Sequence, residues 1–234
     1  MEAHLIQVLS DPRALARRAS ELFVMAASTA ISARDLFSVA LSGGSTPELF
    51  FRTLGSEPFS QGVQWEKTHV FFSDERCVPP SDLMSNFRMA NEALLGQVPA
   101  QVHRIEGELG PDEAALRYSG TIRDVLGDKP VLDMMLLGMG ADGHTASLFP
   151  GSALLREEQM LAVPVPGREP PRVSLTLPVI NSARTIMFLV TGEQKAAALR
   201  EILEEGNPGG LPAGMVSNGA LWLLDEAAAS ELRR

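Results

Sequence analysis

Apolar positions follow two spacings along this chain, one typical of buried strands and the other of amphipathic helices. Short apolar runs bounded by glycine, proline or polar residues predict strands, and apolar residues three or four positions apart predict helices. Strands are expected at residues 5–9, 37–41, 68–73, 102–105, 132–137, 160–165, 173–177, 185–191 and 220–224. Helices are expected at residues 12–30, 48–54, 86–95, 111–126 and 193–204, and after Asp225.

This order of elements indicates an α/β fold. Because strands alternate with helices over most of the chain, the simplest arrangement is a doubly wound, mostly parallel sheet with helices on both faces. The sequence contains neither an internal repeat nor a low-complexity linker, so residues 1–234 are expected to form a single domain.

The most informative stretch is residues 131–151, in which the apolar run 132–137 ends abruptly in glycine. Three glycines follow this predicted strand. The carboxylate of Asp142 lies between the second and third glycine, and the imidazole of His144 follows the third. Open α/β folds bind ligands at the carboxyl ends of their strands. Imidazole has an ordinary pKa of about 6.5, so His144 is the strongest candidate for a general base. The alternative is a structural loop histidine.

The literal pattern Gly138-x-Gly140-x-x-Gly143 also matches the fingerprint of dinucleotide-binding folds. That site needs a long helix after the third glycine and an acidic residue at the end of the next strand. Pro150 and Gly151 would interrupt such a helix, and the acidic residues at 157 and 158 precede the next predicted strand. The pattern is therefore weak evidence for a nicotinamide cofactor.

A second glycine-rich turn follows the predicted strand 37–41 and contains Gly43, Gly44, Ser45 and Thr46. A glycine turn that leads into a helix exposes backbone N–H groups to an anion, and the helix dipole favours a phosphate there. No lysine follows the glycines, so the turn is not a Walker loop. The alternative is a tight connection in which Ser45 or Thr46 caps the helix.

Charged residues mark two further places. Asp74, Glu75 and Arg76 follow the apolar strand 68–73, where they form either a solvated loop or the lining of a site. Arg172 precedes the strand 173–177, and Lys195 lies in the first turn of a predicted helix, where a cation opposes the helix dipole unless an anion is near. A solvated lysine remains the alternative for Lys195.

Composition excludes several classes of protein. The net charge of −9 argues against a nucleic-acid surface, and no apolar run reaches the length of a membrane span. The N-terminus lacks the features of a signal peptide, and the single cysteine, Cys77, fits a reducing compartment, so a cytoplasmic location is expected. The histidines at 4, 69 and 103 show no metal-ligand spacing, and no serine-nucleophile elbow is present, so no metal and no serine nucleophile are expected.

Taken together, the motifs closely resemble the 6-phosphogluconolactonase family, over almost the whole chain. The matching segments are Leu41–Pro47, 73–76 with Val78 and Pro79, 85–88, 138–151, Arg172 with 174–177, Gly192 with Lys195, 211–213 and 222–225. The resemblance implies a fold like that of glucosamine-6-phosphate deaminase, a modified Rossmann arrangement. It also implies hydrolysis of 6-phospho-D-glucono-1,5-lactone to 6-phosphogluconate in the pentose phosphate pathway, without a cofactor, by a monomer or weak homodimer.

The resemblance further implies roles for individual residues. His144, Asp142 and Arg76 would carry the catalysis, with His144 as the base that activates water, Asp142 holding the loop and the ring, and Arg76 stabilising either the carbonyl oxygen or the substrate's own anion. The substrate and its phosphate would be bound by Gly43, Gly44, Ser45, Thr46, Asp74, Arg172 and Lys195. The segment 211–218 lacks a basic residue often present in the family, which leaves one substrate contact in doubt.

Two other functions are compatible with such a fold. A glucosamine-6-phosphate deaminase/isomerase typically has tyrosine at the position of Arg76 and, at the position of Phe149, a glutamate that supports the histidine. Phenylalanine cannot orient a ring by hydrogen bonding, so its presence counts against isomerisation. A non-catalytic sugar-phosphate sensor would normally carry a DNA-binding module, and neither the sequence before residue 5 nor the acidic charge suits one.

Overall fold

The computed structural model describes residues 5–216 and 219–233, which form a seven-stranded parallel sheet with helices on both faces and a smaller sheet beside it. The large sheet has the strand order β1-β10-β9-β6-β2-β3-β5. Its strands are β1 (Leu5–Leu9), β2 (Phe37–Leu41), β3 (Thr68–Phe72), β5 (Gln101–Val102), β6 (Met134–Leu137), β9 (Thr185–Val190) and β10 (Leu221–Asp225). The predicted doubly wound α/β class is confirmed.

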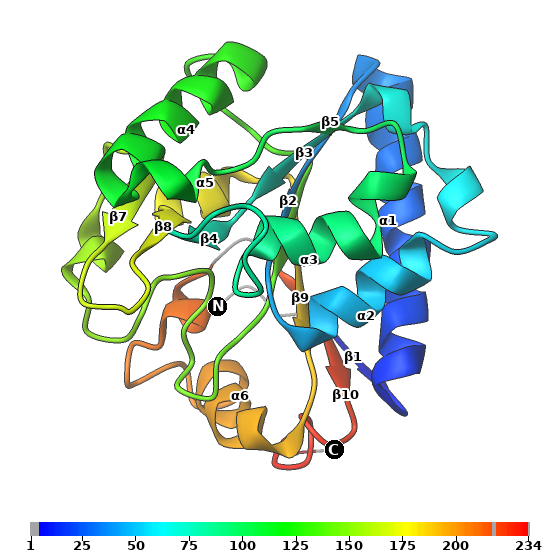
Figure 1. The fold of residues 1–234 in the computed structure, drawn as a ribbon. Coiled ribbons are helices and arrows are strands. Elements are labelled where there is room, and N and C mark those ends of the chain that lie inside the picture. Colours follow the sequence, from blue (N-terminus) through cyan, green and yellow to red (C-terminus); the bar gives the residue numbers. More distant parts are fainter. Residues whose placement is uncertain (1–4, 217–218, 234) are drawn as a thin grey trace.

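The helices lie on both sides of this sheet, as Figure 1 shows with the sheet nearly edge-on. Helices α1 and α2 cover one face, and the small sheet with α4 lies on the other side. The helices are α1 (Pro12–Arg34), α2 (Ser45–Leu54), α3 (Asn86–Ala93), α4 (Pro111–Leu126), α5 (Leu177–Ser182) and α6 (Ala196–Leu203). No helix of the described part is long and apolar enough to cross a bilayer.

The predicted strand-forming runs are the buried centre of the sheet. All residues of β2 and β6 are buried, which is why their sequences are almost continuously apolar. The first helix begins as predicted, because the Asp11 carboxylate accepts hydrogen bonds from the backbone N–H groups of Arg13 and Ala14, at 2.8 and 2.9 Å. The helix continues to Arg34, beyond the predicted end at residue 30.

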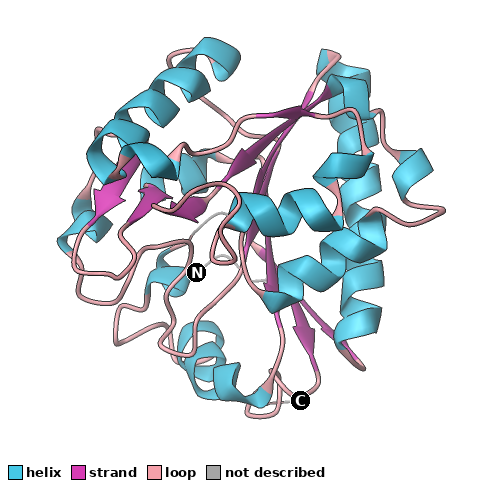
Figure 2. Cartoon of the chain, viewed as in Figure 1, coloured by secondary structure: helices cyan, strands magenta, loops and turns pink. Residues whose placement is uncertain are grey.

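The second sheet was not predicted (Figure 2). It is antiparallel, in the order β4-β8-β7, and consists of β4 (Asp74–Arg76), β8 (Arg172–Leu175) and β7 (Ala162–Val165). The charged segment after β3 is thus a short strand and not a loop. The spacing of apolar residues identifies strands but does not determine which strands pair with one another. The pairing of these three strands therefore could not be predicted from the sequence pattern.

Several predicted boundaries were wrong. The helix expected after Asp225 is a series of turns, in which the Asp225 carboxylate accepts from the backbone N–H of Ala228 at 2.7 Å. The predicted strand 173–177 ends at Leu175 and leads into α5, and the predicted strand 102–105 is reduced to β5. The predicted helix 193–204 starts as a 3₁₀ turn, with α6 following from Ala196.

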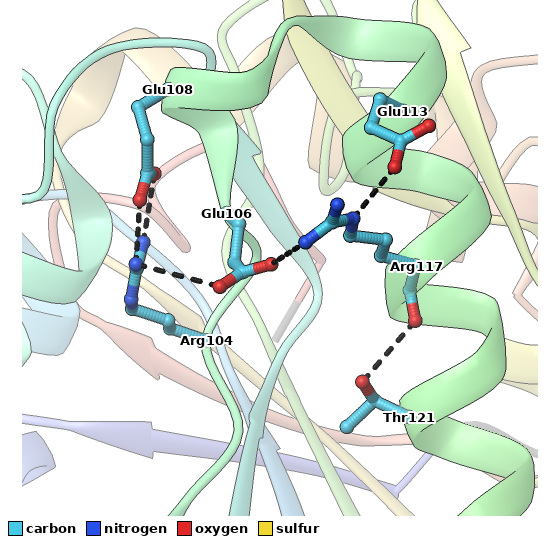
Figure 3. Close-up of polar contacts among 6 residues, drawn as sticks. All are labelled: Arg104, Glu106, Glu108, Glu113, Arg117 and Thr121. Carbon is cyan, nitrogen blue, oxygen red and sulfur yellow. Dashed lines mark hydrogen bonds and ion pairs between the residues drawn. The ribbon is translucent and has the colours of Figure 1, made fainter.

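Surface ion pairs connect the start of α4 to the segment before it (Figure 3). Arg104 binds the Glu108 carboxylate through two nitrogens, at 2.8 and 2.6 Å, and also lies 3.7 Å from Glu106. Arg117 on α4 pairs with Glu106 at 3.6 Å and with Glu113 at 2.6 Å. Because these pairs are exposed, each contributes little to stability, roughly 0–1 kcal/mol.

A buried tyrosine connects α4 to the strand that leads into the small sheet. The Tyr118 hydroxyl donates to the carbonyl oxygen of Phe72 at 2.8 Å and accepts from its backbone N–H at 2.7 Å. Burial raises the pKa of Tyr118, so the hydroxyl stays protonated and available as a donor. Phe72 precedes Ser73 and Asp74, and this contact therefore fixes the chain where β3 passes into β4.

The variant Tyr118→Phe is expected to lower the free energy of unfolding by about 1–3 kcal/mol, because it leaves two buried backbone groups of Phe72 unpaired. Urea denaturation measures this loss. The matched control is Thr121→Ala on the same helix, which removes an exposed hydroxyl bonded to the carbonyl oxygen of Arg117 and should cost less than about 0.5 kcal/mol. Equal stability of Tyr118→Phe and the wild type would contradict the assigned contact.

Because two histidines are partly buried, the free energy of unfolding is expected to depend on pH. His69 and His103 stack with their ring nitrogens 3.0 Å apart, and burial lowers the pKa of both. As pH falls below the ordinary value of about 6.5, the unfolded chain takes up protons that the folded chain resists, so stability is present above that pH and declines below it. Unfolding free energies at about pH 7 and about pH 5 should differ less in His69→Gln than in the wild type. If this difference were the same in His69→Gln and in the wild type, the buried histidines would not be the cause of the pH dependence.

Candidate active site

The carboxyl ends of the central strands surround a cavity of about 400 Å³. Its walls are the loops after β2, β6 and β9 together with residues of the small sheet. Parallel strands place their following loops at one edge of a sheet, which explains why motifs far apart in sequence meet there. The cavity is lined by nine of the predicted site residues, namely Gly43, Gly44, Ser45, Thr46, Asp74, Arg76, His144, Arg172 and Lys195.

The tenth predicted residue, Asp142, does not line the cavity but binds His144 directly. Its Oδ1 lies 2.5 Å from Nδ1 of the ring and accepts from the backbone N–H of His144 at 3.2 Å. Burial acts to raise the pKa of Asp142, but the hydrogen bonds from His144 outweigh burial, and the pKa lies below its ordinary value. The carboxylate is therefore ionised at neutral pH and orients the ring, leaving Nε2 as the nitrogen available for chemistry.

The contact between Asp142 and His144 requires glycine at position 140. A Cβ atom at Gly140 would overlap both Nδ1 of His144 and Oδ1 of Asp142. The backbone N–H of Gly140 also donates to the carbonyl oxygen of His144 at 2.9 Å, which closes the loop on itself. Gly143 adopts a positive φ of 76°, a conformation that glycine reaches without strain. The glycines predicted to expose backbone thus shape the loop around the imidazole.

Ser147, which sequence reasoning did not select, connects this loop to the small sheet. Its hydroxyl donates to Oδ2 of Asp74 at 2.6 Å, and its backbone N–H donates to the Ser174 hydroxyl at 3.2 Å. Oδ1 of Asp74 lies 3.3 Å from the Asn86 amide nitrogen. The Asp74 carboxylate, predicted to bind substrate, is therefore buried and hydrogen-bonded at both oxygens to protein groups.

Glu75 is not part of the cavity. Its buried carboxylate accepts from the backbone N–H groups of Asn86 and Phe87, both at 2.8 Å, and from the Ser85 hydroxyl at 3.0 Å. Burial raises the pKa of Glu75, while these hydrogen bonds oppose the rise. An anion at the first turn of α3 stabilises the helix, so Glu75 anchors α3 beside the site.

The glycine turn after β2 begins α2 at Ser45 and not at residue 48 as predicted. The alternative in which Ser45 or Thr46 caps this helix is wrong, because the cap residue is Gly44 and no side chain caps it. The Thr46 hydroxyl instead lies 2.6 Å from the Thr191 hydroxyl, which joins the loops after β2 and β9. The residues of the turn line the cavity, and no side chain caps the helix that begins there.

The position of the Asn86 side chain explains why residue 43 in this turn is a glycine. A Cβ atom at Gly43 would overlap the Asn86 side chain, whose amide donates to the carbonyl oxygen of Asp74 at 2.9 Å. Asn86 also lines the cavity. Sequence reasoning assigned it no role, although it lies within the matched segment 85–88. Gly43 lies 43 positions earlier in the sequence, and its proximity to Asn86 could not be predicted from residue spacing.

Two arginines lie side by side in the small sheet. Arg76 on β4 is the register partner of Arg172 on β8, and the Nε atoms of both are buried without a hydrogen-bond partner. Burial lowers the pKa of Arg172, and the charge of Arg76 adds to this effect. Among the described residues, no carboxylate lies within ion-pair distance of either side chain. An anion would relieve both the repulsion and the missing hydrogen bonds.

Lys195 completes the positive lining at the loop after β9. It lies at the end of the 3₁₀ turn Glu193–Lys195, directly before α6. Burial lowers the pKa of Lys195, and the charge of Asp142 opposes this shift. In the described ranges no carboxylate pairs with its ammonium group, so a bound anion would also favour its charged form.

The described part of the chain contains no cluster of three or more histidine, cysteine, aspartate or glutamate side chains able to hold a metal ion. Cys77 is half-buried, and burial raises the pKa of its thiol to about 11, so it is mostly protonated at neutral pH. A protonated thiol is a poor nucleophile, whereas His144 lines the cavity.

Comparison with known proteins shows what the chain is similar to. The chain is 40% identical over 238 residues to 6-phosphogluconolactonase of Rattus norvegicus, which covers 96% of this chain and 92% of the relative. The structure of 6-phosphogluconolactonase from Trypanosoma cruzi superposes with a TM-score of 0.88 at 29% identity, covering 99% of this chain and 97% of that chain. A monomeric glucosamine-6-phosphate deaminase superposes with a TM-score of 0.81 at 21% identity, covering 97% of this chain and 99% of that chain, and this likeness shows the fold alone.

The model of one protein family matches residues 10–224, a range that includes every residue of the cavity except Asp225. The chain therefore belongs to the family of glucosamine-6-phosphate isomerases and 6-phosphogluconolactonases.

Proposed function

We propose that this protein hydrolyses 6-phospho-D-glucono-1,5-lactone to 6-phosphogluconate, in the oxidative pentose phosphate pathway. Two relatives that are 40% identical to this chain, and align over 96% of it, are 6-phosphogluconolactonases. The single observation that carries the mechanism is the hydrogen bond between Asp142 and Nδ1 of His144, at the edge of a cavity with a positive lining.

His144 acts as the general base. With Nδ1–H directed at the Asp142 carboxylate, Nε2 is unprotonated and accepts a proton from water as the water oxygen attacks the lactone carbonyl. The resulting imidazolium, stabilised by Asp142, donates that proton to the ring oxygen as the C–O bond of the tetrahedral intermediate breaks. Water and side chains supply every group that these steps need, without a metal or a cofactor.

The positive lining holds the substrate. The backbone N–H groups of Gly44, Ser45 and Thr46 at the start of α2 bind phosphate oxygens, because they combine free donors with the helix dipole. Lys195 and Arg172 neutralise the phosphate charge. Arg76 stabilises negative charge on the carbonyl oxygen or on the substrate anion, and its buried, unpartnered Nε supports such a role.

Asp74 has a supporting role in this proposal. Its carboxylate is engaged by Ser147 and Asn86, so it fixes the substrate-facing ends of three segments of the chain. The net charge of −9 repels anions at long range, and the three cations that line the cavity, Arg76, Arg172 and Lys195, offset this repulsion locally.

The competing function is that of a glucosamine-6-phosphate deaminase/isomerase. Isomerisation moves hydrogen between carbons and therefore needs more proton-handling groups around the base. In this chain the second neighbour of the His144 ring is Phe149, which handles no proton. A non-catalytic sugar-phosphate sensor would not need the oriented pair of Asp142 and His144.

Three further expectations remain part of the proposal. The protein is expected to be a monomer or weak homodimer, without nucleic-acid partners, and to act in the cytoplasm. Sedimentation at increasing protein concentration tests the oligomeric state. The half-buried thiol of Cys77 is compatible with a reducing compartment.

A coupled assay with freshly generated 6-phosphogluconolactone is expected to show enzyme-dependent formation of 6-phosphogluconate. His144→Ala should lower kcat by at least about 10²-fold, because it removes the general base, while product still binds in calorimetry. His103→Ala is the matched control, since it removes a histidine outside the cavity. Ammonia release from glucosamine 6-phosphate that is faster than lactone hydrolysis would reverse the assignment.

Lys195→Ala is expected to raise KM about 10-fold or more with a much smaller change in kcat, because its ammonium group contacts a part of the substrate that does not react. Lys129→Ala, at an exposed lysine, is the control. If Lys195→Ala lowered kcat strongly at unchanged KM, the lysine would act on the reacting carbonyl and not on the phosphate.

A further inference from the structure

His144 has a second close neighbour besides Asp142, the aromatic ring of Phe149. The two ring centroids lie 4.6 Å apart, and the ring planes are inclined by 37°. Phe149 is 8% exposed and does not line the cavity. It therefore contacts the proposed base without occupying the space available to a substrate.

Phe149 is itself held by a cation. The guanidinium carbon of Arg168 lies 3.6 Å from the centroid of the Phe149 ring, and that of Arg172 lies 5.6 Å from it. Arg168 belongs to the exposed turn between β7 and β8, and among described residues it has no carboxylate within ion-pair distance. Its contact with the ring is a cation–π interaction. Phe149 thus contacts both His144 and Arg168.

The contact with Phe149 supplies a constraint on the His144 ring that the hydrogen bond to Asp142 does not. A hydrogen bond at Nδ1 fixes the position of one ring atom but leaves the ring able to tilt about it. Packing against the face of a second ring restricts this tilt and so determines where Nε2 points. Displacing a reacting group by about 1 Å can lower a rate by about 10²-fold.

We propose that Phe149, held in place by Arg168, is a positioning residue that fixes the plane of the His144 ring for lactone hydrolysis. This inference rests on the proposed role of His144 as the general base. A residue that acts only through the base changes the chemical step and leaves substrate binding nearly unchanged.

The test compares kcat and KM of Phe149→Leu with those of the wild type. We expect kcat to fall about 10- to 100-fold, with KM within about 3-fold. In the double variant with Asp142→Asn, the two losses should be clearly less than multiplicative, because both changes release the same ring. Fully multiplicative losses, or a loss confined to KM, would overturn the proposal.

The arginine provides a second test that does not depend on how the core tolerates leucine. Arg168→Met keeps the length of the side chain but removes the charge, and should lower kcat about 2- to 5-fold, in line with an exposed cation–π contact. Arg168→Lys, which retains a cation, should recover most of this loss. Arg123→Met, at an exposed arginine near the end of α4, is the control and should behave as the wild type.

The outcomes separate this inference from the proposed function. If His144→Ala keeps its activity, the role of the histidine fails, and the positioning role fails with it. If His144→Ala is inactive but Phe149→Leu, folded by circular dichroism, keeps its kcat, only the positioning role is wrong. If Arg168→Met raises KM at constant kcat, Arg168 acts on the substrate's charge and not on the ring.

Discussion

The hydrogen bond between the Asp142 carboxylate and Nδ1 of His144 is the interaction on which the proposed chemistry depends. It selects the ring nitrogen that remains free, and it stabilises the imidazolium that forms when that nitrogen takes a proton. The bond forms within a turn of three residues and is possible because Gly140 has no side chain to occupy the same space. In this loop, Gly140, Asp142 and His144 are therefore each required for the same contact.

Positive charge is the second constraint on the site, because the protein as a whole is acidic. Arg76 and Arg172 are register partners in the small sheet, and neither has a carboxylate partner among the described residues. Holding two like charges together costs free energy, which the buried, hydrogen-bonded carboxylate of Asp74 only partly offsets. An arrangement of this kind is stabilised by a bound anion.

Much of the site could be predicted because its residues follow strands directly. His144 and the glycine turn come after strongly apolar runs, and the topology of a parallel sheet then places them at one edge. Ser147, Asn86 and Phe149 could not be assigned roles in the same way. Each acts through a residue far away in sequence or through packing: Ser147 on Asp74, Asn86 beside Gly43, and Phe149 against a ring whose orientation is decided by the folded loop.

The sequence by itself determined the class of fold, the central strands and the loops that carry chemistry, because burial on both faces of a sheet demands continuous apolar runs. It also carried the motifs by which the family is identified. Tertiary structure alone decided that residues 74–76 form a strand of a second sheet, that Arg76 pairs with Arg172, and that Asp225 ends a strand without starting a helix. Strand pairing and side-chain contacts depend on which segments meet in space, and local spacing does not contain that information.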